Sequence, residues 1–129
     1  MIQFLDELQK LNLPKGKFAL FGSIALSVRN IRKARDLDLI VKADLWDELL
    51  KKYPDDLRQD PLRIQIGNIE IFKDWLNLTD KIDEMIDRAE TIEGYSFVKL
   101  EYFLEWKKFR GLSKDKADIK LVEKYLDNN

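Results

Sequence analysis

Apolar and polar positions follow two rhythms along the chain, and each rhythm predicts one type of element. Apolar residues recur at helical spacing within 2–11, which predicts an amphipathic helix. The segment 17–21 is an apolar run that ends at a glycine, and it predicts a buried strand. A helix is expected to begin over 23–28, with Ser23 placed to cap it. Positions 36–41 alternate and then become apolar, which predicts a second strand.

The same patterns, together with capping and helix-breaking residues, predict the remaining elements. These are a helix capped by Asp44 and ending near Tyr53, a hairpin with arms 62–66 and 69–72, a helix from Thr79 to about Arg88, a brief extended stretch over 91–97, and closing helices over 99–110 and 114–126. We therefore expect an α/β (α+β) protein with a small mixed sheet of about four strands flanked by helices. One domain is expected over 1–129, with a core over about 17–75 and a helical part over about 78–127.

The amino-acid composition excludes several kinds of catalytic and metal-binding site. The 129 residues include no cysteine and no histidine, which excludes disulfides, thiolate zinc sites and histidine-based catalytic triads. Basic and acidic residues nearly balance, at 23 and 24, which argues against a protein that coats duplex nucleic acid. No apolar run approaches the roughly 20 residues of a membrane span, and no signal peptide is evident. We therefore expect a cytoplasmic protein that does not associate with a membrane.

The turn at Gly22 and Ser23 is a candidate phosphate-binding turn. Glycine lets the backbone approach a ligand closely, and a helix N-terminus presents unpaired N–H groups. Ser23 adds a hydroxyl group. The alternative is that Gly22 only permits a tight connection between strand and helix.

Acidic residues on the predicted strands are candidate metal ligands. Asp36 and Asp38 stand at positions i and i+2 of a strand, so both carboxylates project from one face. Such a pair is unfavourable unless a cation lies beside it, and Mg²⁺ suits carboxylate ligands. Glu70 lies in an otherwise apolar strand and is the third candidate, with Asp74 as the fallback. The alternatives are solvated acids at a strand start and the exposed face of a hairpin.

The order of these residues resembles a known signature. Gly22-Ser23, a spacer over 24–35, and the acid–apolar–acid strand at Asp36 to Leu39 are similar to the nucleotidyltransferase superfamily related to DNA polymerase β. The sequence looks most like the minimal bacterial and archaeal branch, which includes nucleotidyltransferases of toxin–antitoxin and abortive-infection systems. A weaker similarity involves a closing helical motif that comprises Leu100, Leu104, Lys107, Arg110, Lys114, Asp115 and Asp118.

This resemblance implies transfer of NMP from an NTP to a hydroxyl acceptor, which would be a protein, an RNA end or a small molecule. Asp36, Asp38 and Glu70 would be catalytic and would bind two Mg²⁺ ions, with Mn²⁺ as a substitute. Gly22 and Ser23 would bind the triphosphate. Glu70 departs from the commoner aspartate at its position. The large second domain of many relatives is missing, so a homodimer or a partner protein is expected to complete the site.

Several further residues carry two interpretations each. Lys107, Arg110 and Lys114 would reach the nucleotide phosphates, or would be ordinary residues of surface helices. Asp115 and Asp118 are expected to cap and pair locally. The basic loop residues would steer a polyanion or would be solvated; they are Arg29, Arg32, Lys33 and Arg35. Some aromatic residues would form a base-stacking wall, although most are expected in the core; they are Trp75, Tyr95, Tyr102, Phe103 and Trp106.

Three hypotheses remain open from the sequence. The first is an active metal-dependent nucleotidyltransferase. The second is a binding partner or antitoxin of the same fold with little or no catalysis. The third is an unrelated α/β domain with a structural or interaction role, which would be favoured if Asp36, Asp38 and Glu70 did not converge.

Overall fold

Seven short strands form one mixed sheet in the computed structural model, which describes residues 2–128. The strands are β1 (Phe18–Phe21), β2 (Leu37–Val41), β3 (Leu57–Arg58), β4 (Arg63–Ile66), β5 (Ile69–Phe72), β6 (Glu90–Ile92) and β7 (Tyr95–Phe97). Their order across the sheet is β3-β4-β5-β2-β1-β7-β6. The two strands beside β2 run in opposite directions: β1 pairs with it antiparallel, and β5 pairs with it parallel.

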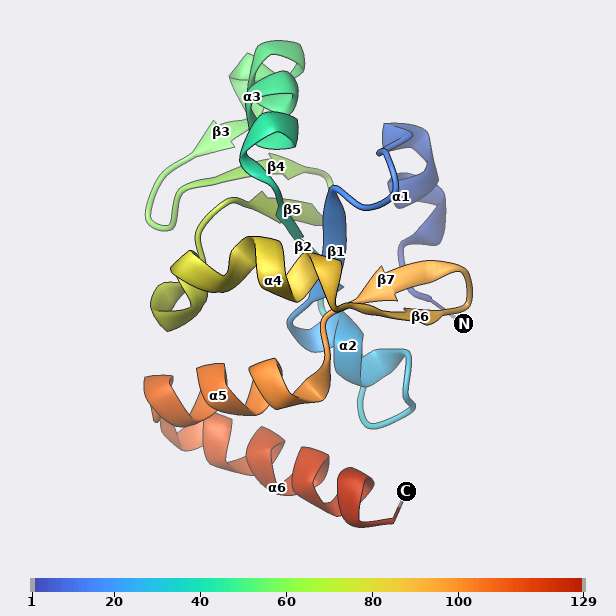
Figure 1. Ribbon diagram of the computed structural model, residues 1–129, viewed down its shortest axis with the longest axis vertical. Coiled ribbons are helices and arrows are strands. Elements are labelled where there is room, and N and C mark those ends of the chain that lie inside the picture. The colour runs from blue at the N-terminus through green and yellow to red at the C-terminus, as the bar shows by residue number, and fades with distance from the viewer. Residues whose placement is uncertain (1, 129) are drawn as a thin grey trace.

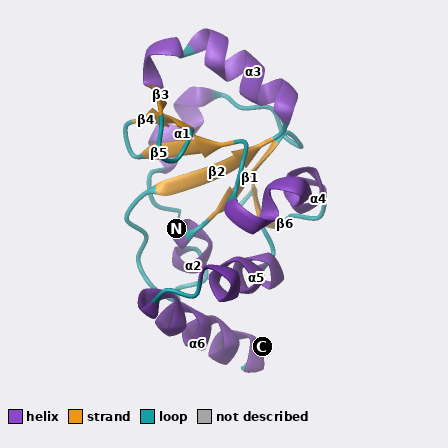
Figure 2. Cartoon of the chain, turned by 90° about the vertical axis from the view of Figure 1, so that its left-hand side faces the viewer, coloured by secondary structure: helices purple, strands orange, loops and turns teal. Residues whose placement is uncertain are grey.

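Helices surround this sheet (Figures 1 and 2). They are α1 (Leu5–Leu11), α2 (Ser23–Ser27), α3 (Ala43–Lys52), α4 (Ile82–Asp87), α5 (Leu100–Arg110) and α6 (Ser113–Asp127), with 3₁₀ turns η1 (Pro54–Asp56) and η2 (Leu76–Lys81). The closing helices α5 and α6 pack together at one end of the molecule, and α3 lies at the other end (Figure 1). Within the described residues, no helix combines the length and the apolar character needed to cross a membrane.

The prediction of about four strands was wrong, because the sheet in the described residues has seven. The additional strands are β3, β6 and β7, which contain two or three residues each. Strands this short do not display an alternating pattern, since alternation needs at least four residues to be recognised. The four predicted strands correspond to β1, β2, β4 and β5, and the α+β class is retained.

The two faces of the sheet carry separate apolar cores, and the strand pattern explains this division. Successive strand residues point to opposite faces. In β1, Phe18 and Leu20 therefore enter the core that contains α1 and α3, whereas Ala19 and Phe21 enter the core that contains α4 and α5. All four are buried, as expected for a strand covered on both faces.

Several predicted helix starts differ from the structure, and α1 begins at Leu5 although its pattern begins at Ile2. Gly22 is the N-cap of α2, and Ser23 is the first helical residue without a capping hydrogen bond. Lys42, and not Asp44, is the N-cap of α3. The segment expected to form a helix from Thr79 is partly a 3₁₀ turn, and α4 begins only at Ile82. Boundaries shift by a few residues because several polar residues near a helix start are compatible with the cap position.

Candidate functional site

Asp36, Asp38 and Glu70 converge at one end of the central strands. The parallel register of β2 and β5 places Asp38 directly beside Glu70. Asp36 immediately precedes β2 and lies two residues before Asp38, so its side chain projects to the same face. One carboxylate oxygen from each residue lies within 4.8 Å of the other two. This geometry joins residues that are 34 positions apart in the sequence, counted from 36 to 70.

The environment of this triad disfavours negative charge. Burial, followed by the charges of Asp36 and Glu70, raises the pKa of Asp38 from 3.8 to about 9. Burial, followed by hydrogen bonding and charge from Glu70, raises the pKa of Asp36 from 3.8 to about 6, and Arg35 opposes the shift. The cause is that three acids share a partly dry site. A nearby cation would reverse the effect.

The donor set fits a hard divalent cation. Carboxylate oxygens are the ligands that Mg²⁺ and Mn²⁺ prefer among side chains. One of them, Oδ1 of Asp38, is buried and has no hydrogen-bond partner in the described chain. Buried acceptors are normally paired, so an oxygen in this state is well placed to be a ligand.

Gly22 brings the backbone against the triad. Its φ of 72° and ψ of −148° lie in a region that residues with a side chain rarely occupy. A Cβ atom at this position would lie 2.7 Å from Oδ2 of Asp38. Glycine is therefore required both for the turn between β1 and α2 and for the close approach. Because α2 contains only five residues, its N-terminus contributes little dipole, and the hydroxyl of Ser23 is the stronger polar feature.

A cleft of about 700 Å³ lies beside the triad. Its polar lining includes Ser23, Asp36, Asp38 and Asp74, and its apolar lining includes Leu62 and Phe72 among others. This volume falls within the range of about 300–1,000 Å³ that is typical of small-molecule sites. A ligand in the cleft would contact the carboxylates at one side and an apolar wall at the other.

That apolar wall contains two tryptophans. Trp75 and Trp106 line the cleft, with ring centroids 5.0 Å apart in an edge-on arrangement. Their Nε1 atoms are buried and have no hydrogen-bond partner within residues 2–128. Both tryptophans are also buried in the same apolar core as Tyr102 and Phe103, as expected for most of the aromatic residues. Tyr95 lies outside this cleft.

The predicted phosphate-binding cations also line the cleft, but two of them already form ion pairs with aspartates. Lys107 is buried, and its Nζ lies 3.1 Å from Oδ1 of Asp115 and 3.2 Å from Oδ2 of Asp118. Arg110 donates from Nε to Oδ2 of Asp115 at 2.8 Å, and a second ion-pair contact joins the same side chains. Lys114 has no ion-pair partner among residues 2–128 and is the cation with the freest side chain.

Asp115 and Asp118 differ from each other in their partners. Asp115 accepts a hydrogen bond from the backbone N–H of Leu112 at 3.0 Å, which confirms that it caps and pairs locally. Hydrogen bonds, chiefly from Arg110, lower the pKa of Asp115 in spite of its burial. Asp118 pairs with Lys107 on the preceding helix, and it also accepts a bidentate pair from the distant Arg32 at 2.8 and 2.9 Å, which was not expected. Burial acts to raise the pKa of Asp118, but the bonds from Arg32 and Lys107 lower it.

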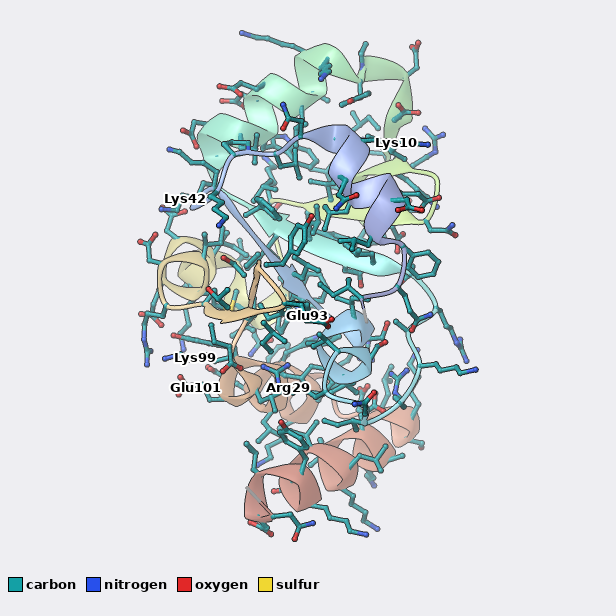
Figure 3. The ribbon with its side chains drawn as sticks, turned by 90° about the vertical axis from the view of Figure 1, so that its right-hand side faces the viewer. Lys10, Arg29, Lys42, Glu93, Lys99 and Glu101 are labelled. Carbon is teal, nitrogen blue, oxygen red and sulfur yellow. The ribbon has the colours of Figure 1, made fainter. Side chains whose placement is uncertain are left out.

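The basic loop before β2 is therefore attached at two points and is not uniformly solvated. Arg32 joins it to α6 through Asp118. Arg29, labelled in Figure 3, donates to the carbonyl of Ala25 at 2.6 Å and pairs with Glu90, and its side chain is only 5% exposed. Arg29 is thus a structural contact, and steering of a polyanion would fall to Lys33 and Arg35.

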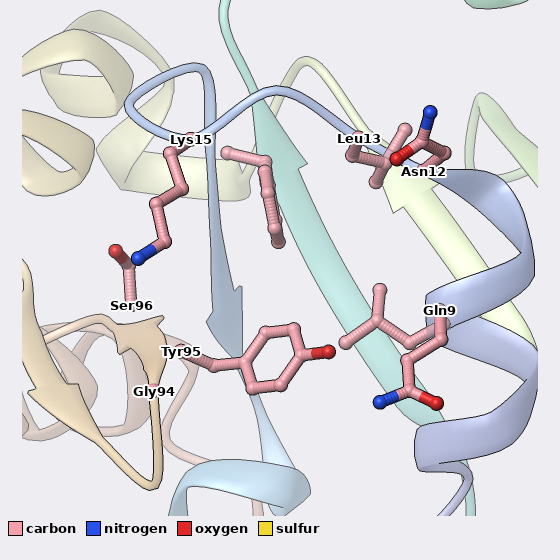
Figure 4. A pocket seen from close by; sticks show the side chains of 9 residues that line it. Gln9, Asn12, Leu13, Lys15, Gly94, Tyr95 and Ser96 are labelled. Carbon is pink, nitrogen blue, oxygen red and sulfur yellow. The ribbon is translucent and has the colours of Figure 1, made fainter.

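A second, smaller cavity of about 280 Å³ lies between α1 and the hairpin of β6 and β7 (Figure 4). Gln9, Asn12, Lys15 and Tyr95 contribute polar groups to it. No carboxylate lines this cavity, so it has no donor set for a hard cation. The cleft beside the triad is the better candidate site.

Arg63 was missed by sequence reasoning. Its Nε lies 2.9 Å from Oε1 of Glu70. The hairpin register pairs Gln65 with Glu70, and Arg63 shares a face with Gln65 because it lies two residues away on β4. The predicted hairpin around Gly67 contained this signal, since a two-residue turn fixes which residues face each other.

Comparison with known proteins adds no assignment. No protein-family model matches the chain, and no curated protein has a significantly similar sequence. The geometry of the cleft and its carboxylates therefore carries the functional argument alone.

Proposed function

We propose that this protein is a divalent-metal-dependent nucleotidyltransferase, which transfers NMP from an NTP to a hydroxyl acceptor. The observation that carries the proposal is the convergence of Asp36, Asp38 and Glu70 within 4.8 Å at the side of a 700 Å³ cleft. Acid triads of this kind are compatible with phosphoryl chemistry, in which charge stabilisation and positioning supply most of the rate enhancement. The absence of histidine from the chain is no obstacle to such chemistry.

In this proposal Asp36, Asp38 and Glu70 would hold Mg²⁺ or Mn²⁺. When bound, such an ion neutralises charge on the phosphates and activates a hydroxyl nucleophile. The acceptor oxygen would form a bond to the α-phosphorus, the bond from that phosphorus to the β-phosphate oxygen would break, and pyrophosphate would leave. Glu70 would take up the proton of the acceptor hydroxyl.

The remaining lining residues would bind and orient the nucleotide. Ser23 and the backbone at Gly22 would contact the triphosphate close to Asp38, because glycine leaves room there. Lys114 would contribute a free positive charge, with Arg110 at a partly neutralised position. The base would lie against Trp75 and Trp106, where aromatic rings exclude water and favour stacking.

One observation favours a second candidate, a binding partner or antitoxin with little or no catalysis. Asp115 and Asp118 engage three of the four cationic residues that line the cleft within residues 2–128, namely Arg32, Lys107 and Arg110. Fewer free cations would weaken the hold on a triphosphate. A toxin–antitoxin setting, a protein or RNA acceptor and a homodimer remain part of the proposal for partners.

Thermal melting with each NTP, with and without Mg²⁺, tests the proposal. A rise in melting temperature that requires both Mg²⁺ and the acid pair would demonstrate linked binding. The Asp36→Ala/Asp38→Ala variant should lose this rise. The matched control is Asp47→Ala/Glu48→Ala, which removes the same charge from the exposed face of α3 and should keep it.

Activity is then measured with α-labelled NTP and by release of pyrophosphate. Label transfer that depends on Asp38 supports catalysis. A nucleotide-dependent melting shift without label transfer to any acceptor supports the second candidate. If no nucleotide changes the melting temperature of the wild type, the nucleotide site itself is refuted.

A further inference from the structure

A positively charged side chain already lies against the triad. Arg63 on β4 donates from Nε to Oε1 of Glu70 at 2.9 Å. The two side chains are only 19% and 18% exposed, so the contact is partly shielded from solvent. In such a setting charge–charge interactions are stronger than those of surface pairs.

The guanidinium of Arg63 is held in place by other acceptors. Its Nη1 donates to the backbone carbonyls of Gln59 and Pro61 at 3.1 and 2.8 Å. Its Nη2 donates to Oε1 of Gln65 at 3.3 Å. Pro61 also lines the cleft. These contacts with the turn between β3 and β4 and with Gln65 of β4 hold the guanidinium beside Glu70.

We infer that Arg63 is a built-in counter-charge, which positions the Glu70 carboxylate and limits the affinity of the triad for a divalent ion. The inference rests on the proposed function, because it requires an ion at Asp36, Asp38 and Glu70. A fixed positive charge beside Glu70 repels a second cation at the same carboxylate. It also stabilises the ion-free protein, since it offsets part of the repulsion among three acids.

Two opposite effects therefore follow from removing this charge. The ion-free protein loses a stabilising partner and melts at a lower temperature. The triad becomes more negative and binds a divalent ion more tightly. A residue with a purely structural role would give only the first effect, because loss of local order weakens a metal site.

The test is a calorimetric titration of the chelator-treated protein with Mn²⁺ alone. Arg63→Gln should bind Mn²⁺ roughly tenfold more tightly than the wild type. Arg63→Lys keeps the charge and loses most of the carbonyl contacts, so its affinity should stay within about twofold of the wild type. The matched control is Arg88→Gln, which removes the same charge from a half-exposed side chain that bonds to Tyr102 and Glu101. Arg88 lies just before β6, the edge strand on the other side of the sheet from β4, and should not influence the triad.

A second measurement follows the response of the wild type itself to Mg²⁺. Mg²⁺ should shift the side-chain Nε–H NMR signal of Arg63 as Glu70 turns toward the ion, and should leave the signal of Arg88 unchanged. Arg63→Lys assigns the signal by its loss. An Arg63 signal that Mg²⁺ does not shift, or an Arg63→Gln affinity equal to or below that of the wild type, overturns the inference. A wild type that takes up neither ion refutes the proposed function itself.

Discussion

Gly22 and Asp38 lie so close together that the glycine has no room for a side chain. A Cβ atom on Gly22 would lie 2.7 Å from Oδ2 of Asp38, below any ordinary contact distance. The backbone at Gly22 also has a φ of 72°. The strand end that carries the acid and the turn that faces the cleft are therefore built as one unit.

Gly22→Ala should lower the free energy of unfolding by roughly 2–4 kcal/mol, because backbone strain and a steric clash add together. Urea denaturation measures the change. The matched control is Gly94→Ala, where φ is 84° but no atom lies within 4 Å of the added Cβ. Gly94→Ala carries the strain without the clash, so equal losses in the two variants would contradict the role of the contact with Asp38.

Asp38→Asn should stabilise the metal-free protein at pH 8 by at least about 1 kcal/mol. The pKa of Asp38 is raised to about 9 in the folded protein, above its ordinary value of 3.8. A raised acid pKa means that the folded state binds more protons than the unfolded state. The wild type therefore loses stability as the pH rises between these two pKa values. The asparagine variant lacks this loss, and the difference should shrink toward pH 4.

Chemical denaturation of chelator-treated protein across pH 4–9 checks this expectation. Asp47→Asn serves as the control, because Asp47 is an exposed residue on α3 and does not line the cleft beside the triad. A difference between Asp38→Asn and wild type that does not change with pH would contradict the repulsion within the triad.

Asp115→Asn should destabilise the protein by roughly 3 kcal/mol at pH 7, because it leaves the buried Lys107 and Arg110 without their shared partner. The pKa of Asp115 is lowered from its ordinary 3.8, chiefly by Arg110. A lowered acid pKa contributes stability above the ordinary value, and this stability is lost as the pH falls below it.

The penalty for Asp115→Asn should therefore decrease as the pH falls from 7 to 3. Urea unfolding at both pH values measures it. The exposed Asp127→Asn at the end of α6 provides the control and should change little at either pH. A penalty for Asp115→Asn that stays the same at pH 3 would show that the amide disrupts packing and not charge pairing.

Arg32 and Asp118 should show a coupling free energy of about 1–2 kcal/mol in a double-mutant cycle with Arg32→Gln and Asp118→Asn. The pair is bidentate, and Asp118 is only 10% exposed on its side chain. The exposed pair Lys81 and Glu105 provides the comparison, with an expected coupling below about 0.5 kcal/mol. Similar coupling in the two cycles would contradict a specific tie between the basic loop and α6.

The sequence predicted the elements that have a clear periodicity. The strands around Leu20 and Leu39 and the hairpin at Gly67 have enough residues to display their pattern, and the closing helices are long. The two-residue strand β3 was missed, and the single extended stretch predicted over 91–97 is a pair of three-residue strands, β6 and β7. Strands this short depend for their pairing on the neighbouring strands more than on their own residues.

The candidate site was predictable in its acids and less predictable in their partners. The i and i+2 spacing of Asp36 and Asp38 fixes their common face from the sequence alone. The bond between Arg32 and Asp118 joins residues 86 positions apart, and no local pattern encodes such a contact. Arg63 is an intermediate case. The hairpin turn fixes the register that places Gln65 opposite Glu70, and Arg63 lies two residues from Gln65 on the same strand.

The division of β1 and β2 between two cores has a consequence for how this gene can change over time. Adding or deleting one residue within Leu37–Val41 would turn Asp38 into an apolar interior and would turn Leu39 toward the cleft. Length changes within this strand would disrupt the acid triad and should therefore be eliminated by selection. The turn of β6 and β7 at Gly94, where an added Cβ would meet no atom within 4 Å, can accept such changes. Natural variation in chain length is expected to accumulate at that hairpin and to be absent from the strand that carries the acids.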